Sequence, residues 1–223
     1  LEREEKYIQK MLGDKDTYFP QNGCPIDVVE VSDKVAIIVL DTEWYLTNWD
    51  KRPGINDKCD IKSREKFFLE LEDAIKDNRD KTTIIAMHHP MASYGPHGGQ
   101  FSLEKQFYPK KLPVPIPILG TFINVLRKTS GASIADLQNK RYRSLINRVT
   151  TLAQYSEKVI FASGHEHTLQ YIVEKSTPQI VSGSGAKKGT TRLLNGSKFT
   201  TGHMGYATLE IYQDGSSQVR IDG

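Results

Sequence analysis

Short apolar runs rich in β-branched residues recur along the chain and predict the strands of a sheet. Two such runs, residues 26–31 and 35–40, are separated only by Ser32-Asp33-Lys34, which predicts two strands joined by a tight turn. Two further runs, residues 82–87 and 159–162, are apolar throughout, as is typical of strands that are buried on both faces. Shorter strands are expected at residues 169–173, 179–182, 206–212 and 218–221.

Two segments place apolar residues at helical spacing. Ser63 is a suitable N-cap, and apolar side chains then recur three or four residues apart until a polar run ends the pattern. A second helical stripe covers residues 137–153, and its basic side chains lie largely away from the apolar face and form a solvated surface. Because the first helix connects the strands at 35–40 and 82–87, we expect a parallel strand–helix–strand unit. The predicted fold class is α/β with a largely buried mixed sheet.

A long irregular segment interrupts these patterns. Residues 92–136 contain a Gly/His-rich stretch followed by Pro113, Pro115 and Pro117 in strict alternation, and insertions of this kind are usually functional or mobile. We find no internal repeat and no domain boundary, so residues 1–223 are interpreted as part of a single domain that carries this Pro-rich insertion.

Charge and cysteine content exclude some classes of partner and site. The 223 residues include 30 basic and 27 acidic side chains, well interspersed, and a formal charge of +3 implies no nucleic-acid partner. Nothing approaches the run of about 18 apolar residues that a transmembrane helix needs. Cys24 and Cys59 are too few for a disulfide framework or a cysteine zinc site, and we expect two unpaired thiols rather than a single bridge.

Histidines lie just beyond the C-terminal ends of both strands that are predicted to be buried. His88 and His89 come after residues 82–87, and His165-Glu166-His167 comes after residues 159–162. In α/β proteins the carboxyl ends of strands are where sites are built. A His-x-His pair on a loop can direct two imidazoles toward neighbouring metal ions, and Gly164 before it permits a backbone path that a side chain would obstruct. By spacing alone, a metal site and a chance surface pair both remain open.

The order of these features resembles the calcineurin-like phosphoesterases, which include the purple acid phosphatases, over roughly residues 24–185. The resemblance is carried by Asp41-Thr42 after one strand, by Ala86-Met87-His88-His89-Pro90 after the next, and by Ser163-Gly164-His165-Glu166-His167 after the last. It implies an αββα sandwich with mixed β-sheets, of which this chain supplies the C-terminal half. Bacteroidetes-type members of the family are the most similar.

The resemblance also implies a site and a reaction. His88 and His165 would be ligands of one metal ion and His167 a ligand of the other, and histidine with carboxylate ligands suits iron, manganese or zinc. Two such cations clamp a phosphoryl group and lower the pKa of a bridging water. The implied activity is the hydrolysis of phosphate mono- or diesters.

The chain departs from the family in lacking its earlier motifs. Asp-x-His, Gly-Asp-x-x-Asp and Gly-Asn-His-Asp or -Glu do not occur, although they supply the bridging aspartate, an asparagine ligand and the histidine that protonates the leaving group. We expect the N-terminal half of the same domain, before Leu1, to carry them, and the chain alone to be inactive. Some Bacteroidetes-type members are fused to an outer-membrane β-barrel, which implies a location in the bacterial cell envelope. The alternative is a non-catalytic interaction module that retains the fold and uses the Pro-rich part of the insertion, residues 109–126, as its partner surface.

Three further residues are assigned roles beside the proposed ligands. His89 should point away from His88, so we interpret it as a structural or supporting histidine that could reach the substrate. His97, on a Gly-rich loop, is either a substrate-phosphate ligand or an exposed loop histidine. The resemblance gives Asp41 no ligand role, and we expect it to make structural hydrogen bonds beside Thr42.

Overall fold

The computed structural model describes residues 2–47, 59–101, 131 and 133–223, together with the isolated positions Phe107, Phe122, Val125 and Thr129. Pro113, Pro115 and Pro117, and with them most of the proposed partner surface, lie outside the described residues. The chain divides into two compact units. The first unit comprises Leu1–His88 and Arg148–Val159, and the second comprises His89–Asn147 and Ile160–Gly223.

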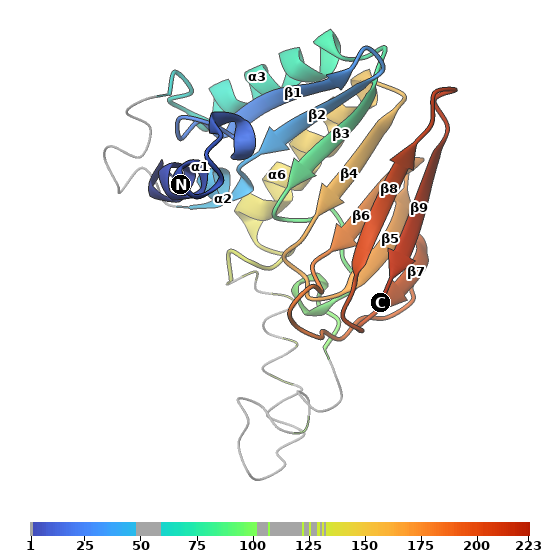
Figure 1. Ribbon diagram of the computed structural model, residues 1–223. Coiled ribbons are helices and arrows are strands. Elements are labelled where there is room, and N and C mark those ends of the chain that lie inside the picture. The colour runs from blue at the N-terminus through green and yellow to red at the C-terminus, as the bar shows by residue number, and fades with distance from the viewer. Residues whose placement is uncertain are drawn as a thin grey trace. The chain divides into compact units, whose positions relative to one another are not determined.

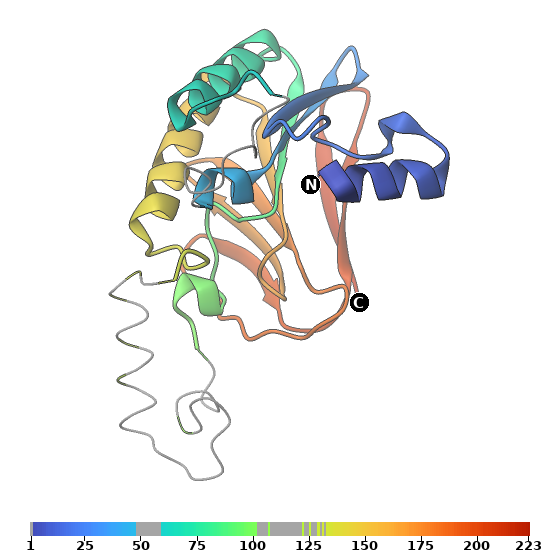
Figure 2. The same cartoon turned by 90° about the vertical axis from the view of Figure 1, so that its left-hand side faces the viewer.

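Three strands of the first unit confirm the predicted strand–helix–strand arrangement (Figure 1). β1 (Ile26–Ser32) and β2 (Val35–Leu40) pair antiparallel across the predicted tight turn, with Ile26 opposite Leu40. β2 and β3 (Thr82–Met87) pair parallel, from Val35 opposite Thr82 to Leu40 opposite Met87. The crossover between them contains α3 (Arg64–Asp77), which lies along one side of these strands (Figure 2).

The core of the first unit is aromatic. α3 begins after Ser63, whose hydroxyl accepts a hydrogen bond of 3.1 Å from the Lys66 N–H, and this confirms the predicted N-cap. Its buried face packs on α2 (Thr42–Leu46), where the Trp44 ring stacks 5.8 Å from that of Phe67. The sequence pattern did not predict α2, because one and a half turns are too short to show a helical period.

Asp41 has the structural role that was expected of it. Its Oδ1 caps α2 by accepting a hydrogen bond of 3.0 Å from the Trp44 N–H. Burial is the main reason why the pKa of the Asp41 carboxyl lies above its ordinary value. Among the residues that the structure describes, its Oδ2 is the one buried side-chain polar atom without a hydrogen-bond partner.

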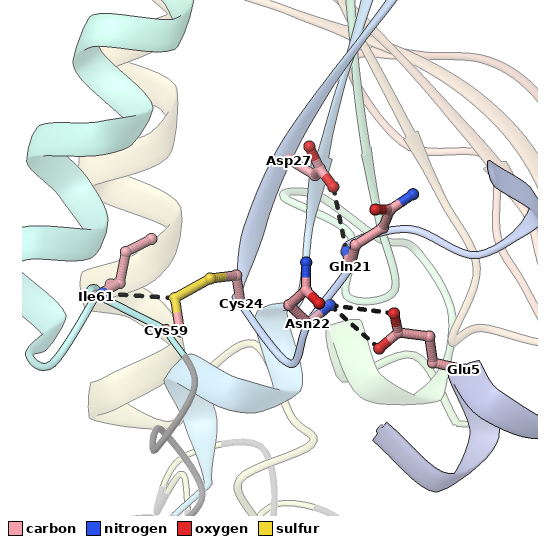
Figure 3. Close-up of a disulfide and its surroundings, with 7 residues drawn as sticks. All are labelled: Glu5, Gln21, Asn22, Cys24, Asp27, Cys59 and Ile61. Atoms are coloured by element: carbon pink, nitrogen blue, oxygen red, sulfur yellow. Dashed lines mark hydrogen bonds between the residues drawn. A yellow bond between two sulfur atoms is a disulfide. The ribbon is translucent and has the colours of Figure 1, made fainter. Parts of the chain in front are cut away.

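The two cysteines form a disulfide, so the prediction of two unpaired thiols is wrong (Figure 3). Cys24 precedes β1 and Cys59 precedes α3, and their Cα atoms are 5.1 Å apart. Spacing could not show this, because the fold brings together segments that are 35 residues apart. The adjacent loop is also held to α1 (Glu2–Leu12), since the Asn22 N–H donates to the Glu5 carboxylate at 3.1 and 3.2 Å. A 3-10 turn, η1 (Lys15–Thr17), follows α1.

The second unit also mixes parallel and antiparallel pairing. Parallel pairing joins β4 (Val159–Ser163) to β6 (Thr177–Ser182), and β6 and β7 (Ser197–Thr201) each pair antiparallel with β5 (Leu169–Glu174). The predicted strands are confirmed, and so is the fold class, α/β with mixed strand pairing. β7 was not predicted, since Ser-Lys-Phe-Thr-Thr contains no apolar run.

The remaining elements of the described chain include a hairpin, a helix and short 3-10 turns. β8 (Tyr206–Ile211) and β9 (Ser217–Asp222) form a separate antiparallel hairpin. The helix predicted at 137–153 is α6 (Lys140–Leu152), followed by the 3-10 turn η5 (Ala153–Tyr155), and a further 3-10 turn, η3 (Pro96–Gly98), follows β3. No helix in the described part of the chain has both the length and the apolar character needed to cross a membrane.

Candidate metal centre

A sharp turn after β4 distributes three consecutive side chains to different environments. His165 has a left-handed φ of 66°, the Glu166 N–H donates to the Gly164 carbonyl at 2.7 Å, and the Thr168 N–H donates to the Glu166 carbonyl at 2.7 Å. His165 is half-buried, Glu166 is buried and His167 is exposed. A Cβ on Gly183 would lie 2.0 Å from the Glu166 carbonyl oxygen. The backbone after β6 can therefore lie this close to the turn only because residue 183 is glycine.

His89 and His165 lie side by side within the second unit. Their ring centroids are 4.5 Å apart, and the His89 ring meets the Tyr142 ring edge-on at 5.5 Å. His165 Nε2 lies 2.9 Å from the Ala135 carbonyl oxygen. Because a carbonyl only accepts hydrogen bonds, Nε2 carries the hydrogen, and Nδ1 carries the lone pair of the neutral ring.

The arrangement suits a metal ion. Ring nitrogens of His89 and His165 lie within 4.8 Å of each other, and His88, one peptide bond before His89, offers a third within the same limit. Imidazole nitrogens are ligands of zinc and iron, and a ligating histidine commonly donates its other N–H to a carbonyl, as His165 does. The residues present therefore fit one metal ion. His167 lies outside this group, and its role as ligand of a second ion stays a prediction.

His97 lies against the other side of His165. The two ring centroids are 4.2 Å apart, and His97 Nδ1 is 2.9 Å from Oδ1 of Asp136, whose side chain is buried. His97 itself keeps 26% of its side chain exposed, so a small ligand can reach it. Sequence reasoning missed Asp136, because 39 residues separate it from His97 and no local pattern marks it.

Glu166 was also missed, since it was interpreted only as the spacer of the His-x-His pair. Its Oε1 accepts hydrogen bonds from the Ser93 hydroxyl at 3.0 Å, from the His97 N–H at 2.6 Å and from the Gly98 N–H at 3.3 Å. The loop packs closely here, because a Cβ on Gly98 would lie 1.9 Å from the Ser93 carbonyl oxygen. The carboxylate thus sets the shape of the loop that bears His97.

Buried side chains hold the segment that follows His89. Gln179 Oε1 accepts from the N–H groups of Met91 at 2.8 Å and Ala92 at 3.0 Å. The Tyr142 hydroxyl donates to the Pro90 carbonyl at 2.6 Å. Burial, with smaller contributions from the Glu166 and Asp136 carboxylates, raises the pKa of Tyr142 above its ordinary value, so the hydroxyl keeps its proton and remains a donor.

Comparisons with known proteins give similarity in fold only. No family model and no curated protein sequence matches the chain. Among solved structures, it is similar to GAP50, the anchor in the inner membrane complex of Plasmodium, with 16% identity and a TM-score of 0.48 over 88% of this chain and 48% of that one. PhoD matches with 10% identity and a TM-score of 0.48 over 88% and 40% of the two chains. A putative 5'-nucleotidase from Staphylococcus aureus matches with 14% identity and a TM-score of 0.34 over 92% and 29%.

The chain thus spans less than half the length of each of these proteins. At identities and TM-scores this low, the likenesses decide neither the family nor the activity.

Proposed function

We propose that the protein containing this chain is a metal-dependent phosphoesterase that hydrolyses phosphate mono- or diesters. The observation that carries the proposal is the group of ring nitrogens from His88, His89 and His165 within 4.8 Å of one another, at the ends of β3 and β4. The motifs around these histidines, which resemble those of calcineurin-like phosphoesterases, support the same reaction.

Each side chain then has a role. His88, His89 and His165 would hold an ion of iron, manganese or zinc, and His167 would contribute to a second ion whose other ligands come from the N-terminal half of the domain. Bound metal supplies positive charge that polarises a phosphoryl oxygen and lowers the pKa of water. The Ala135 carbonyl orients His165. His97, partly exposed beside it, would contact a phosphate oxygen through Nε2, which donates a hydrogen bond when the ring carries a hydrogen on both nitrogens.

Metal content and turnover test the proposal together. The full-length protein is purified, its metals are measured by elemental analysis, and its hydrolysis of an aryl phosphate monoester and a diester is assayed. His165→Ala should lower bound metal and should lower kcat/KM by at least about tenfold. His203→Ala is the matched control, because His203 is an exposed histidine of the same unit that lies outside the group. Metal and activity unaffected by His165→Ala would refute the assignment.

The competing function is a non-catalytic interaction module. Absence of both bound metal and turnover in the full-length protein would favour it. Under either function, we propose that the protein is located in the cell envelope. The Cys24–Cys59 disulfide supports it, because such bridges persist in oxidising compartments.

A further inference from the structure

His97 is held at three points within the second unit. Its backbone N–H donates to Glu166 at 2.6 Å, its carbonyl accepts from the Leu137 N–H at 3.0 Å, and its ring Nδ1 meets Asp136 at 2.9 Å. A histidine on a loop ordinarily has freedom in both the backbone and the side chain. Here hydrogen bonds within the protein hold both the backbone and the ring, which lowers the entropic cost of placing the ring against a substrate.

One short segment supports both His97 and His165. The Ala135 carbonyl accepts from His165 Nε2, and the next residue, Asp136, accepts from His97 Nδ1. Because a carbonyl and a carboxylate can only accept, the two neutral rings have opposite tautomers. His165 carries its lone pair on Nδ1, whereas His97 carries it on Nε2.

The two carboxylates are themselves shielded from ligand. Asp136 and Glu166 each have 1% of their surface exposed. Glu166 belongs to the turn that presents His165 and also accepts three hydrogen bonds from the loop of His97, so it ties the positions of these two histidines together. Groups this deeply buried act on a substrate only through the side chains that they orient.

We propose that Asp136 and Glu166 are positioning residues that hold the His97 imidazole in a single orientation and tautomer beside His165. This inference deepens the proposed phosphoesterase activity and rests on it, since His97 is the group that would contact the phosphate. Asp136 fixes the orientation of the His97 ring, and Glu166 fixes the conformation of the loop that carries it.

Nuclear magnetic resonance tests the positioning without reference to activity. In full-length protein labelled with ¹⁵N-histidine and kept free of metal, the neutral His97 ring should be protonated at Nδ1. Asp136→Ala removes the acceptor, and the Nε2-protonated form should then dominate. Asp80→Asn, at a carboxylate whose side chain is 92% exposed, serves as the control and should leave the His97 signals unchanged. A wild-type His97 protonated at Nε2, or signals that are the same in Asp136→Ala, would overturn the proposal.

Kinetics of the metal-loaded protein test whether Asp136 acts through His97. Asp136→Asn, which preserves shape, should lower kcat/KM by about 10–100-fold. The same substitution in a His97→Ala background should change kcat/KM by less than about twofold, because the group it positions is gone. If Asp136→Asn lowered kcat/KM by the same factor in the His97→Ala background as in the wild-type protein, the proposal would be overturned. If the wild-type protein hydrolyses no phosphate ester, the proposed function fails, and the tautomer of His97 still decides the positioning roles.

Discussion

The disulfide gives a prediction whose size follows from chain topology. Replacing both Cys24 and Cys59 by alanine opens a loop of 35 residues, and the loop-entropy relation gives a loss of about 4 kcal/mol in the free energy of unfolding. Alanine is preferred to serine because Cys59 is 3% exposed, and a hydroxyl there would be buried. The bridge joins the segment before β1 to the segment before α3, so the loss should appear in the first unit.

Urea unfolding followed by tryptophan fluorescence measures this loss. Both tryptophans, Trp44 and Trp49, lie in sequence between the two bridged cysteines, and Trp44 is buried in the first unit, so the signal reports on the part of the chain that the bridge closes. Reduced wild-type protein should unfold like the double variant, and oxidised protein should be the more stable. A difference of less than about 1 kcal/mol, with the bridge confirmed by mass spectrometry after alkylation, would refute the reasoning.

Three further substitutions test the described contacts. Asp41→Asn should stabilise the protein at pH 7 more than at pH 3. Burial raises the pKa of Asp41 in the folded state, so the free energy of unfolding falls as the pH rises from the pKa of the unfolded state through that raised pKa, and below the unfolded-state pKa the carboxyl has no such cost. Chemical unfolding at the two pH values measures the difference. Tyr142→Phe removes the hydrogen bond to the buried Pro90 carbonyl and should lower the free energy of unfolding by about 1–2 kcal/mol, measured by thermal unfolding. Gly98→Ala should lower kcat/KM in the full-length protein while leaving metal content unchanged, because its Cβ would displace the Ser93 carbonyl and with it the loop of His97.

Local patterns were sufficient for most of the secondary structure and for the position of His88 and His165 near the ends of two strands, whereas their proposed ligand roles came from the resemblance to a family. The strands ending before His88 and before His165 are largely apolar runs. A run of this kind indicates a buried strand from the local sequence alone. The Ser63 cap and the parallel crossover of β2 and β3 also depend on residues near in sequence and were correctly predicted. α2 and β7 were missed, because they are short and owe their form to packing and pairing.

The sequence by itself determined that histidines stand at the carboxyl ends of two buried strands, because strand length and strand end are local properties of the apolar pattern. Only the tertiary structure decided which groups surround those histidines and whether the two cysteines pair. Cys24 meets Cys59 across 35 residues, Asp136 meets His97 across 39, and Glu166 meets Ser93 across 73. Such contacts depend on how loops return to the sheet, and a single sequence carries no periodic signal for the path of a loop.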